Sequence, residues 1–410
     1  APISEVGVIG WLKQNLFSSW FNTLLTLLSI YFLFIILKDF IPWAWGGHWD
    51  TKSLRECLDL NPDVACFSVL TARWKQLLFG LYPAEEYWRP TVTFILLIFS
   101  IIPILFPKFF RFFWFSIIYP GLAIWLLWGG SIWGVGIVYI GFFLGVLLFI
   151  LLLRNITKNM VIAGISSILF VILFFVFFSD YLVKILDIII PISLSPVESL
   201  KMGGFTLSLI VGITGIVASF PIGILLALGR QSNLPIIKMI CVGFIEFIRG
   251  VPLITLLFVA SVLLNYFLPP GTNFDIVLRV IIMVTLFSAA YMAEVIRGGL
   301  AGLPLGQHEA SASLGLTYWQ SQRLVIMPQA LKISIPGIVN TFIGLFKDTT
   351  LVSIISLRDP VGLASTIRAD QTWNGIYWEL YVAIGLMFFV VCFGMSQYSQ
   401  YLERKLKTDK

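Results

Sequence analysis

The chain has 410 residues, of which 59% are hydrophobic and 12% charged, and its formal net charge is +6. An average soluble domain carries about 25% charged residues, so this chain has too little polar surface to cover a globule in water. The composition excludes an ordinary soluble protein and predicts a protein of the lipid bilayer. The basic residues lie between apolar runs, where they orient membrane proteins, so the positive charge does not indicate nucleic-acid binding.

Long apolar runs recur along the whole chain. A helix needs about 20 apolar residues to cross about 30 Å of hydrocarbon. On this criterion the sequence predicts an all-α polytopic membrane protein with about ten transmembrane helices. They lie near residues 20–41, 90–107, 112–130, 133–153, 160–179, 204–229, 240–268, 276–296, 333–357 and 377–399. The first run is long enough to remain as a span, so we expect no cleavable signal peptide.

Basic residues at the span ends predict the orientation, because cytoplasmic loops are enriched in Lys and Arg. They fall in alternate loops, and with an even number of spans these loops share one side with both termini. We therefore expect both termini in the cytoplasm. The basic residues on that side are Lys108, Arg111, Arg154, Lys158, Arg230, Lys238, Arg297, Arg323, Lys332, Arg404, Lys405, Lys407 and Lys410.

The chain divides into two regions by composition. Residues 1–202 hold five spans, few intramembrane charges and one large outer loop, 42–89. Residues 203–410 hold five spans, charged residues within or beside them and a long cytoplasmic loop, 298–332. Ionisable groups are costly in lipid and usually functional, so we expect the second region to carry the function.

Two cysteines, Cys57 and Cys66, lie in the outer loop. In an oxidising compartment they would form a disulfide, and the expected topology favours this bond over two reduced thiols.

The cytoplasmic loop contains the run EASASLGLTYWQSQRLVIMP, which starts at Glu309. Gly and Pro before this run should end the preceding span, and Glu309 to Gly315 can form a short helix that ends at a glycine. An amphipathic stretch with Trp319 follows, and we expect it to stop at Pro328. A short helix held beyond the bilayer suits docking into a cleft on a cytoplasmic partner.

This run resembles the EAA signature of ABC-importer permeases. Glu309, Ala310, Gly315 and Pro328 match the signature, and Ser311 stands where it has its second alanine. The segments YMAEVIRGGL, GQHEA, MPQALK and LFKDTTL resemble the polar-amino-acid branch. The likeness is greatest to the larger permease of general L-amino-acid importers, in which an N-terminal extension precedes a five-span core.

The resemblance implies a permease subunit that moves L-amino acids across the bacterial inner membrane by alternating access. It implies a heterodimer with a homologous permease, two ATPase subunits that bind ATP and Mg, and a periplasmic amino-acid-binding protein. The cytoplasmic loop would carry the coupling helix, with Glu309 in polar contacts and Gly315 permitting the turn. The chain has no GxxxxGK[ST] loop, so we expect no catalytic residues and no cofactor in this chain itself.

His308 and Glu309 do not predict a metal site. A metalloprotease motif needs a second histidine at position 312, which is Ala312, and His48 is expected on the opposite side of the membrane.

Two pairs with one spacing lie near cytoplasmic span ends: Glu246 with Arg249, and Glu294 with Arg297. Residues three apart share a helix face and can pair. Three interpretations stay open: structural pairing or gating, direct contact with substrate, and charges that simply reach the interface.

Lys347 and Asp348 lie well inside a predicted span and are followed by Thr349 and Thr350. Adjacent helix residues point about 100° apart, so the two charges cannot simply neutralise each other. On a cavity wall they would complement the carboxylate and ammonium of a zwitterionic amino acid. The alternative is an ion pair with the sister permease.

The outer loop before the last span carries Arg358, Asp359, Arg368 and Asp370. These charges either contact a docking binding protein or are simply solvated. Two rival functions remain at this point: an ion-driven secondary transporter, which would need no partner ATPase, and an intramembrane enzyme, for which the sequence lacks a catalytic cluster.

Overall fold

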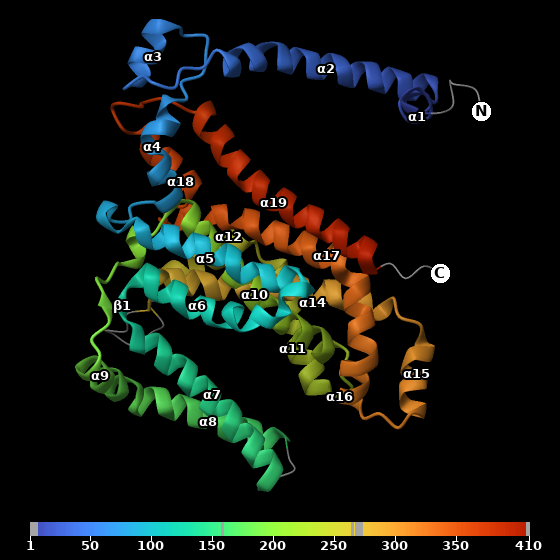
Figure 1. Cartoon of the computed structure of the whole chain (residues 1–410). Helices are drawn as coiled ribbons and strands as arrows, with labels where there is room; N and C mark the ends of the chain where they lie inside the picture. The colour runs from blue at the N-terminus through green and yellow to red at the C-terminus, as the bar shows by residue number, and fades with distance from the viewer. Residues whose placement is uncertain (1–6, 157–159, 264–265, 267–273, 407–410) are drawn as a thin grey trace. The chain divides into compact units, whose positions relative to one another are not determined.

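The computed structural model describes residues 7–156, 160–263, 266 and 274–406. Eight helices in this part of the chain are long and apolar enough to cross a membrane, and two bent helix pairs raise the number to ten if each counts as one span. These segments overlap the ten predicted runs. Residues 264–265 and 267–268 of the predicted run 240–268, and the basic residues Lys158, Lys407 and Lys410, lie outside the described residues. The chain is therefore an all-α polytopic membrane protein (Figure 1).

The chain divides into two compact units. The first holds the described residues up to Trp74 and residues 364–389, and the second holds residues 75–363 and the described residues from Val390 onward. Helices α4 (Ser68–Phe79), α18 (Pro360–Arg368) and α19 (Trp378–Leu406) continue from one unit into the other along the sequence.

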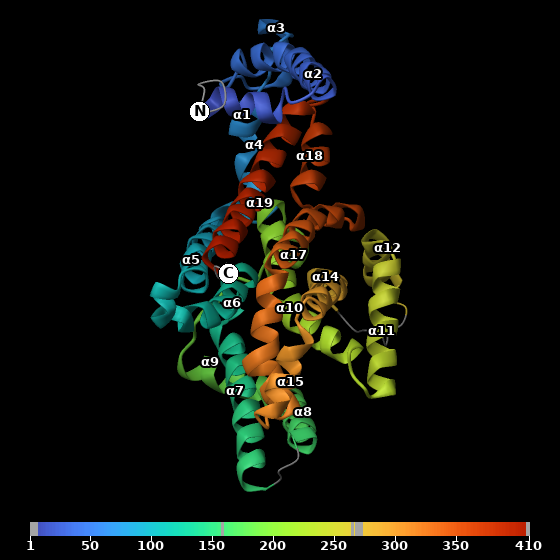
Figure 2. The same cartoon turned by 90° about the vertical axis from the view of Figure 1, so that its right-hand side faces the viewer.

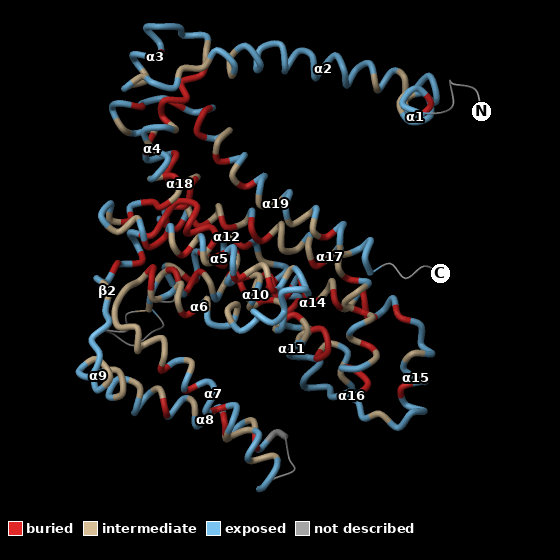
Figure 3. The backbone as a smooth tube through the Cα atoms, viewed as in Figure 1, coloured by how far each residue is buried: buried red, intermediate tan, exposed pale blue. Residues whose placement is uncertain are grey.

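The first unit contains α1 (Gly7–Asn15), α2 (Trp20–Trp45) and α3 (Leu54–Leu60). No residue of α2 is buried (Figure 3). Its apolar residues are spread around the whole helix and form no single apolar face. A helix that is apolar on every side requires an apolar environment on every side, here lipid or another membrane subunit.

One disulfide and two polar contacts stabilise the first unit around the segment 57–73. Cys57 and Cys66 form a disulfide with a Cα–Cα distance of 5.9 Å. The backbone N–H of Cys66 donates to Glu379 Oε1 at 2.8 Å. Arg73 pairs with Asp370 at 2.6 Å. The Cys66–Glu379 and Arg73–Asp370 contacts link segments that are about 300 residues apart in the sequence, whereas the disulfide closes a short local loop.

The second unit begins with the rest of the extension. Its helices include α7 and α8, which pack as a hairpin (Figure 2). Strands β1 and β2 pair antiparallel, with Gly130 opposite Leu194. The elements are η2 (Ala84–Glu86), α5 (Trp88–Leu105), η3 (Pro107–Phe112), α6 (Phe113–Trp128), β1 (Gly130–Ser131), α7 (Ile132–Asn155), α8 (Met160–Phe177), α9 (Ser179–Ile189), β2 (Ser193–Leu194) and η4 (Ser199–Lys201).

The core helices follow in the same unit. Helix α10 packs along α14, and α14 packs along α17 (Figure 2). The elements are α10 (Gly204–Arg230), α11 (Pro235–Gly250), α12 (Leu253–Phe258), the π-helix η5 (Val259–Leu263), α14 (Ile276–Ala301), α15 (Leu305–Ser313), α16 (Tyr318–Ser321), the π-helix η6 (Gln322–Ile326), α17 (Met327–Asp348) and η7 (Thr349–Ile355).

The outer end of α10 meets residues of the extension at close range. Thr206 Oγ1 donates to the carbonyl of Leu78 at 2.9 Å, and Gly204 N–H donates to the carbonyl of Arg358 at 2.7 Å. A Cβ at Gly203 would lie 3.0 Å from Gly80 Cα and 2.6 Å from the Arg358 carbonyl oxygen. Only glycine allows this backbone contact.

Two candidate spans are bent helix pairs, and the first extends to residue 189, beyond the predicted run 160–179. Residues 162–177 and 179–189 are bent by 54°, and α11 is bent by 101° against the segment Leu253–Leu263. The second break lies at Val251, whose φ of −106° and ψ of 131° are extended. The following residue, Pro252, explains this conformation, because proline disfavours the α region at the residue before it.

The predicted stop at Pro328 is wrong. Pro328 is the second residue of α17, within a continuous helical segment from Tyr318 to Ile355. Proline removes one N–H and crowds the carbonyl four residues earlier. The π-helix Gln322–Ile326 lies directly before α17, and its wider turn accommodates the proline without ending the helix.

Candidate functional site

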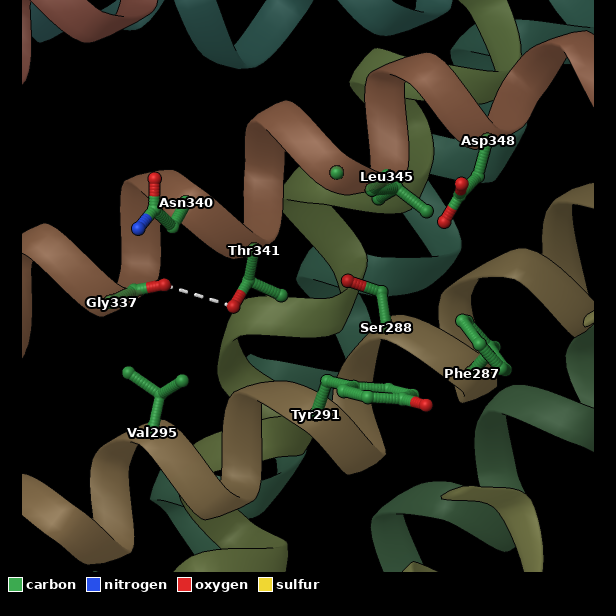
Figure 4. Close-up of a pocket in the computed structure, with 10 residues that line it drawn as sticks. Phe287, Ser288, Tyr291, Val295, Gly337, Asn340, Thr341, Leu345 and Asp348 are labelled. Carbon is green, nitrogen blue, oxygen red and sulfur yellow. Dashed lines mark hydrogen bonds between the residues drawn. The ribbon is translucent and has the colours of Figure 1, made fainter. Parts of the chain in front are cut away.

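A cavity of about 490 Å³ lies between α14 and α17 (Figure 4). Helix α14 contributes the bulkier walls, and α17 contributes small and polar side chains because glycines alternate with polar residues along one face. The lining residues are Phe287, Ser288, Tyr291, Val295, Gly337, Asn340, Thr341, Gly344, Leu345 and Asp348.

Asp348 is the one charged side chain among these ten lining residues. The hydroxyl of Ser288 is buried and has no hydrogen-bond partner among the described residues. Thr341 uses its hydroxyl within the helix and donates to the carbonyl of Gly337 at 2.9 Å (Figure 4). Asn340 adds an amide and Tyr291 a further hydroxyl to the lining. The cavity thus combines one carboxylate with a few uncharged polar groups and apolar walls, which is the usual make-up of a small-molecule site.

The other predicted residues of this segment point elsewhere. Lys347 is exposed and does not line the cavity. Thr349 is buried and donates to the carbonyl of Phe346 at 2.7 Å, while Thr350 donates to the carbonyl of Lys347 at 2.9 Å. The structure therefore brings Asp348 alone of these four to the cavity.

Five charged residues form a cluster beside the cavity: Arg230, Glu246, Arg249, Glu294 and Arg297. Glu294 accepts from Arg297 at 3.1 Å, as the three-residue spacing predicts. The expected Glu246–Arg249 pair is replaced, since Glu246 pairs with Arg230 at 2.8 Å and Arg249 lies 3.8 Å from Glu294. Arg230 is also 2.8 Å from Glu294.

Sequence reasoning missed Arg230 as a member of this cluster. It is the last residue of α10 and reads simply as a basic residue at a span end. Glu246 pairs with Arg230 instead of Arg249 because Arg230, on a third helix, reaches the carboxylates of both Glu246 and Glu294. The cluster touches the cavity through Arg249, whose guanidinium lies 5.4 Å from the ring of the lining residue Tyr291.

The loop 298–332 contains a short helix, α15, which begins at Leu305, four residues before the predicted start at Glu309, and ends at Ser313. The helix ends in a Schellman motif: Gly315 N–H donates to the carbonyl of Ala312 at 2.9 Å and Leu316 N–H to that of Ser311 at 3.3 Å. Gly315 has φ of +69°, which favours glycine. Glu309 and Ala310 are exposed.

Side-chain contacts hold α15 against the helix that follows it. Ser311 and Ser321 are both buried, and their hydroxyls lie 2.7 Å apart. Gln329 donates to Gln307 Oε1 at 3.0 Å. A second cavity of about 310 Å³ lies here and is lined by Gln231, His308, Ser311, Ala312, Leu316, Tyr318, Ser321 and Gln322.

Large apolar side chains are exposed on α15 and at the start of the helical segment that follows it. Leu305 and Leu314 are 78% and 77% exposed, and Trp319 is 59% exposed. Exposed apolar side chains that cluster on one surface mark an interaction site.

Comparison with known proteins identifies one family and two relatives that match nearly the whole chain. The family model of the binding-protein-dependent transport system inner membrane component matches residues 219–408. The chain is 52% identical over 420 residues to the glutamate/glutamine/aspartate/asparagine transport system permease protein BztC of Rhodobacter capsulatus, covering 100% of this chain and 96% of that protein. It is 38% identical over 406 residues to the inner membrane amino-acid ABC transporter permease protein YhdY of Escherichia coli, covering 98% and 93%.

One solved structure is similar to part of the chain. It is a crystal structure of an amino acid ABC transporter with histidines, at 32% identity and a TM-score of 0.44, and the match covers 48% of this chain and 90% of that one.

Proposed function

Since this chain belongs to the family of binding-protein-dependent transport system inner membrane components, as a multi-pass permease subunit of an ABC importer, we propose that it moves L-amino acids into the bacterial cell by alternating access. The observation that carries the proposal is the sequence identity of 52% and 38%, over nearly the whole chain, to two amino-acid permeases.

The cavity between α14 and α17 is the part of the translocation pathway contributed by this chain. Its Asp348 carboxylate accepts the ammonium group of the amino acid in a charge-assisted hydrogen bond. The free hydroxyl of Ser288 is a second polar contact. Lys347, exposed beside this wall, suits the alternative role of an ion pair with a sister permease.

Helix α15 is the coupling helix that transmits movement from a partner ATPase. Two ATPase subunits bind and hydrolyse ATP with Mg, and this chain is not itself catalytic. The proposal is supported by the exposed Glu309 on a helix with a rigid Schellman end at Gly315, and by the exposed apolar side chains around it. The loop 298–332 forms the docking surface, and both termini lie on the same cytoplasmic side.

The permease pairs with a homologous permease as a heterodimer and receives its amino acid from a periplasmic binding protein. Residues 203–410 form the translocating core, and residues 1–202 form an extension with its periplasmic loop in 42–89. The Cys57–Cys66 disulfide fits an oxidising periplasm.

The decisive experiment places the complex in proteoliposomes with the ATPase, the second permease and the binding protein. We expect ATP-dependent uptake of L-amino acids and no uptake with ADP. Glu309→Ala should lower both ATPase association and uptake, whereas Glu403→Ala, which changes an exposed glutamate of the α19 end, should lower neither. Uptake that persists without the ATPase would contradict the proposal.

A further inference from the structure

Helix α11 is held in the core by a narrow contact. Only Ile245 and Ile248 of its described residues are buried. By comparison, α10 and α14 pack along their length, and a Cβ at Gly223 of α10 would lie 2.7 Å from Met292 of α14. We therefore expect α10 and α14 to move as one body and α11 to move more easily.

The C-terminal end of α11 has the features of a hinge. The helix ends at Gly250, Val251 is extended, and α12 starts after Pro252 with a bend of 101°. Pro252 has no N–H to donate, so no helical hydrogen bond from this residue crosses the break. A Cβ at Gly250 would meet nothing within 4 Å, so the space around the hinge is open.

Two ion pairs hold α11 near this hinge, and a third joins its two neighbours, α10 and α14. Arg230 of α10 lies 2.8 Å from Glu246 of α11 and 2.8 Å from Glu294 of α14. Arg249 of α11 lies 3.8 Å from Glu294. The side chains of Glu246 and Arg249 are 56% and 34% exposed, so water can replace their partners when the pairs separate.

The pair within α14 serves as an internal contrast. Glu294 and Arg297 belong to the same helix and stay together in any rigid movement of that helix. A movement of α11 therefore separates only the pairs that Glu246 and Arg249 make, and Glu294 keeps a counter-ion throughout. Because Glu294 is never left without a counter-ion, the electrostatic free energy needed to separate α11 from α14 is lower.

The α11 contacts lie at one end of the cavity. Arg249 stands 5.4 Å from the ring of Tyr291, which lines the cavity, and the next lining residue of α14, Val295, directly follows Glu294. By the expected topology, this is the cytoplasmic end. Separation of α11 from α14 would move Arg249 away from Tyr291 and uncover the cavity wall.

We propose that Arg230, Glu246, Arg249 and Glu294 form a breakable ionic latch, and that α11 swings at Gly250–Pro252 to release the amino acid into the cytoplasm. This inference rests on the proposed function and adds the inner gate. Arg230 is its central positioning residue, because it joins both carboxylates.

A disulfide between α10 and α11 tests whether α11 must move. A Cβ at Gly229 of α10 would lie 3.4 Å from Cys241 Cβ of α11, close to the separation of about 3.5–4.5 Å in disulfides. Gly229→Cys in a Cys392→Ser background should therefore cross-link to the native Cys241 on oxidation with copper phenanthroline. We expect ATP-driven amino-acid uptake by the complex in proteoliposomes to fall about tenfold or more and to return after reduction.

The matched control cross-links two helices of the extension. A Cβ at Gly145 of α7 would lie 3.9 Å from Val171 Cβ of α8. Gly145→Cys with Val171→Cys, in a Cys241→Ser and Cys392→Ser background, should keep uptake within about twofold after the same oxidation. Complete cross-linking of α10 to α11 with unchanged uptake would overturn the latch. Absence of uptake in every complex, including the unmodified one, would instead overturn the proposed function.

A second variant tests the latch without a cross-link, so that the inference does not depend on the folding of the Gly229→Cys chain. Glu246→Gln removes one ion pair and should raise ATP hydrolysis in the absence of binding protein about two- to fivefold. Glu403→Gln, at the exposed α19 end, should leave this basal rate unchanged. Equal basal rates in the two variants would contradict the latch.

Discussion

The hydroxyl groups of Ser311 and Ser321 share a hydrogen bond of 2.7 Å that joins α15 to α16. Ser311 stands where the signature that this loop resembles has an alanine. The hydroxyl that this serine adds is satisfied by Ser321, which lies ten residues later and is also buried. The bond fixes the angle between α15 and the long helical segment that enters the membrane.

Ser311→Ala should destabilise this loop by about 1–3 kcal/mol, because it leaves the Ser321 hydroxyl buried without its partner. The double variant Ser311→Ala/Ser321→Ala should recover most of that loss, since both polar groups are then removed. Limited proteolysis of residues 298–332 in the purified complex measures the effect. Equal damage in the single and double variants would show that the hydrogen bond is not the cause.

Gly315→Ala should weaken the end of α15 by about 1–2 kcal/mol, because an L side chain with φ of +69° crowds the following carbonyl. No neighbouring atom lies within 4 Å of the added Cβ, so the backbone conformation alone sets this cost. We expect less ATPase to co-purify with the variant. Gly315→Asn is the control, because asparagine tolerates this conformation, and it should retain most of the ATPase.

Asp348→Asn should raise the KM for amino-acid uptake about tenfold or more, because a hydrogen bond to a charged group contributes about 1.5–3 kcal/mol. Thr350→Val, two residues after Asp348 and not among the lining residues, should change KM less than twofold by the same measurement. Initial rates in proteoliposomes give both values. An unchanged KM in Asp348→Asn would remove this carboxylate from the pathway.

Loss of the disulfide should loosen the outer part of the first unit. In Cys57→Ser/Cys66→Ser we expect a local loss of about 2–4 kcal/mol. The amide of Cys66, which donates to the buried Glu379, lies inside the affected segment. Hydrogen exchange should increase in peptides that contain residues 65–69 and 376–381. Cys241→Ser, which alters a cysteine outside the disulfide, should leave both peptides unchanged.

Asp359 should make the turn before α18 sensitive to pH. Burial raises the pKa of Asp359 to about 6, although the backbone N–H groups of Gly362 and Val361 donate to it and lower the pKa in part. The ordinary value is about 3.9, so the folded turn binds the proton more tightly than the unfolded chain does. The stability that follows is complete below about pH 4 and is lost as pH rises through about 6.

The free energy that stabilises the folded turn should be about 3 kcal/mol larger below pH 4 than well above pH 6. Hydrogen exchange of residues 356–363 should therefore be slower at pH 4.5 than at pH 7.5, after correction for the intrinsic exchange rate. Asp359→Asn keeps a capping side chain but does not titrate, and it should abolish this pH dependence. A pH dependence that persists in this variant would assign it to another group.

The apolar runs predicted where the helices lie, because about 20 apolar residues in sequence have few alternatives to a span. They did not predict the break after α11, because a count of apolar residues gives no weight to the single residue Pro252, which restricts Val251 to an extended conformation. Pro328 was misread for the opposite reason: a proline ends many helices, but a preceding π-turn can absorb it. The length of an apolar run thus predicts where a spanning helix lies, whereas single prolines and the residues around them decide whether that helix is continuous.

The site was predictable in part. The short helix near Glu309 and the glycine that follows it were predictable, because that signal is local in sequence. The choice between Lys347 and Asp348 was not predictable, since one helix has no reference direction until its neighbour α14 is placed beside it. Arg230 was missed for a similar reason, as its two carboxylate partners lie 16 and 64 residues away on other helices.

The glycine contact between Gly80 and Gly203 limits how the permease can be shortened. Leu78 supplies the carbonyl that accepts from Thr206, so residues 77–80 complete the outer end of α10 although they precede it by over a hundred positions. A permease trimmed at the hydropathy boundary near residue 202 would expose this backbone to solvent or lipid. An engineered minimal permease would have to carry these few residues along, or replace them with a new outer cap.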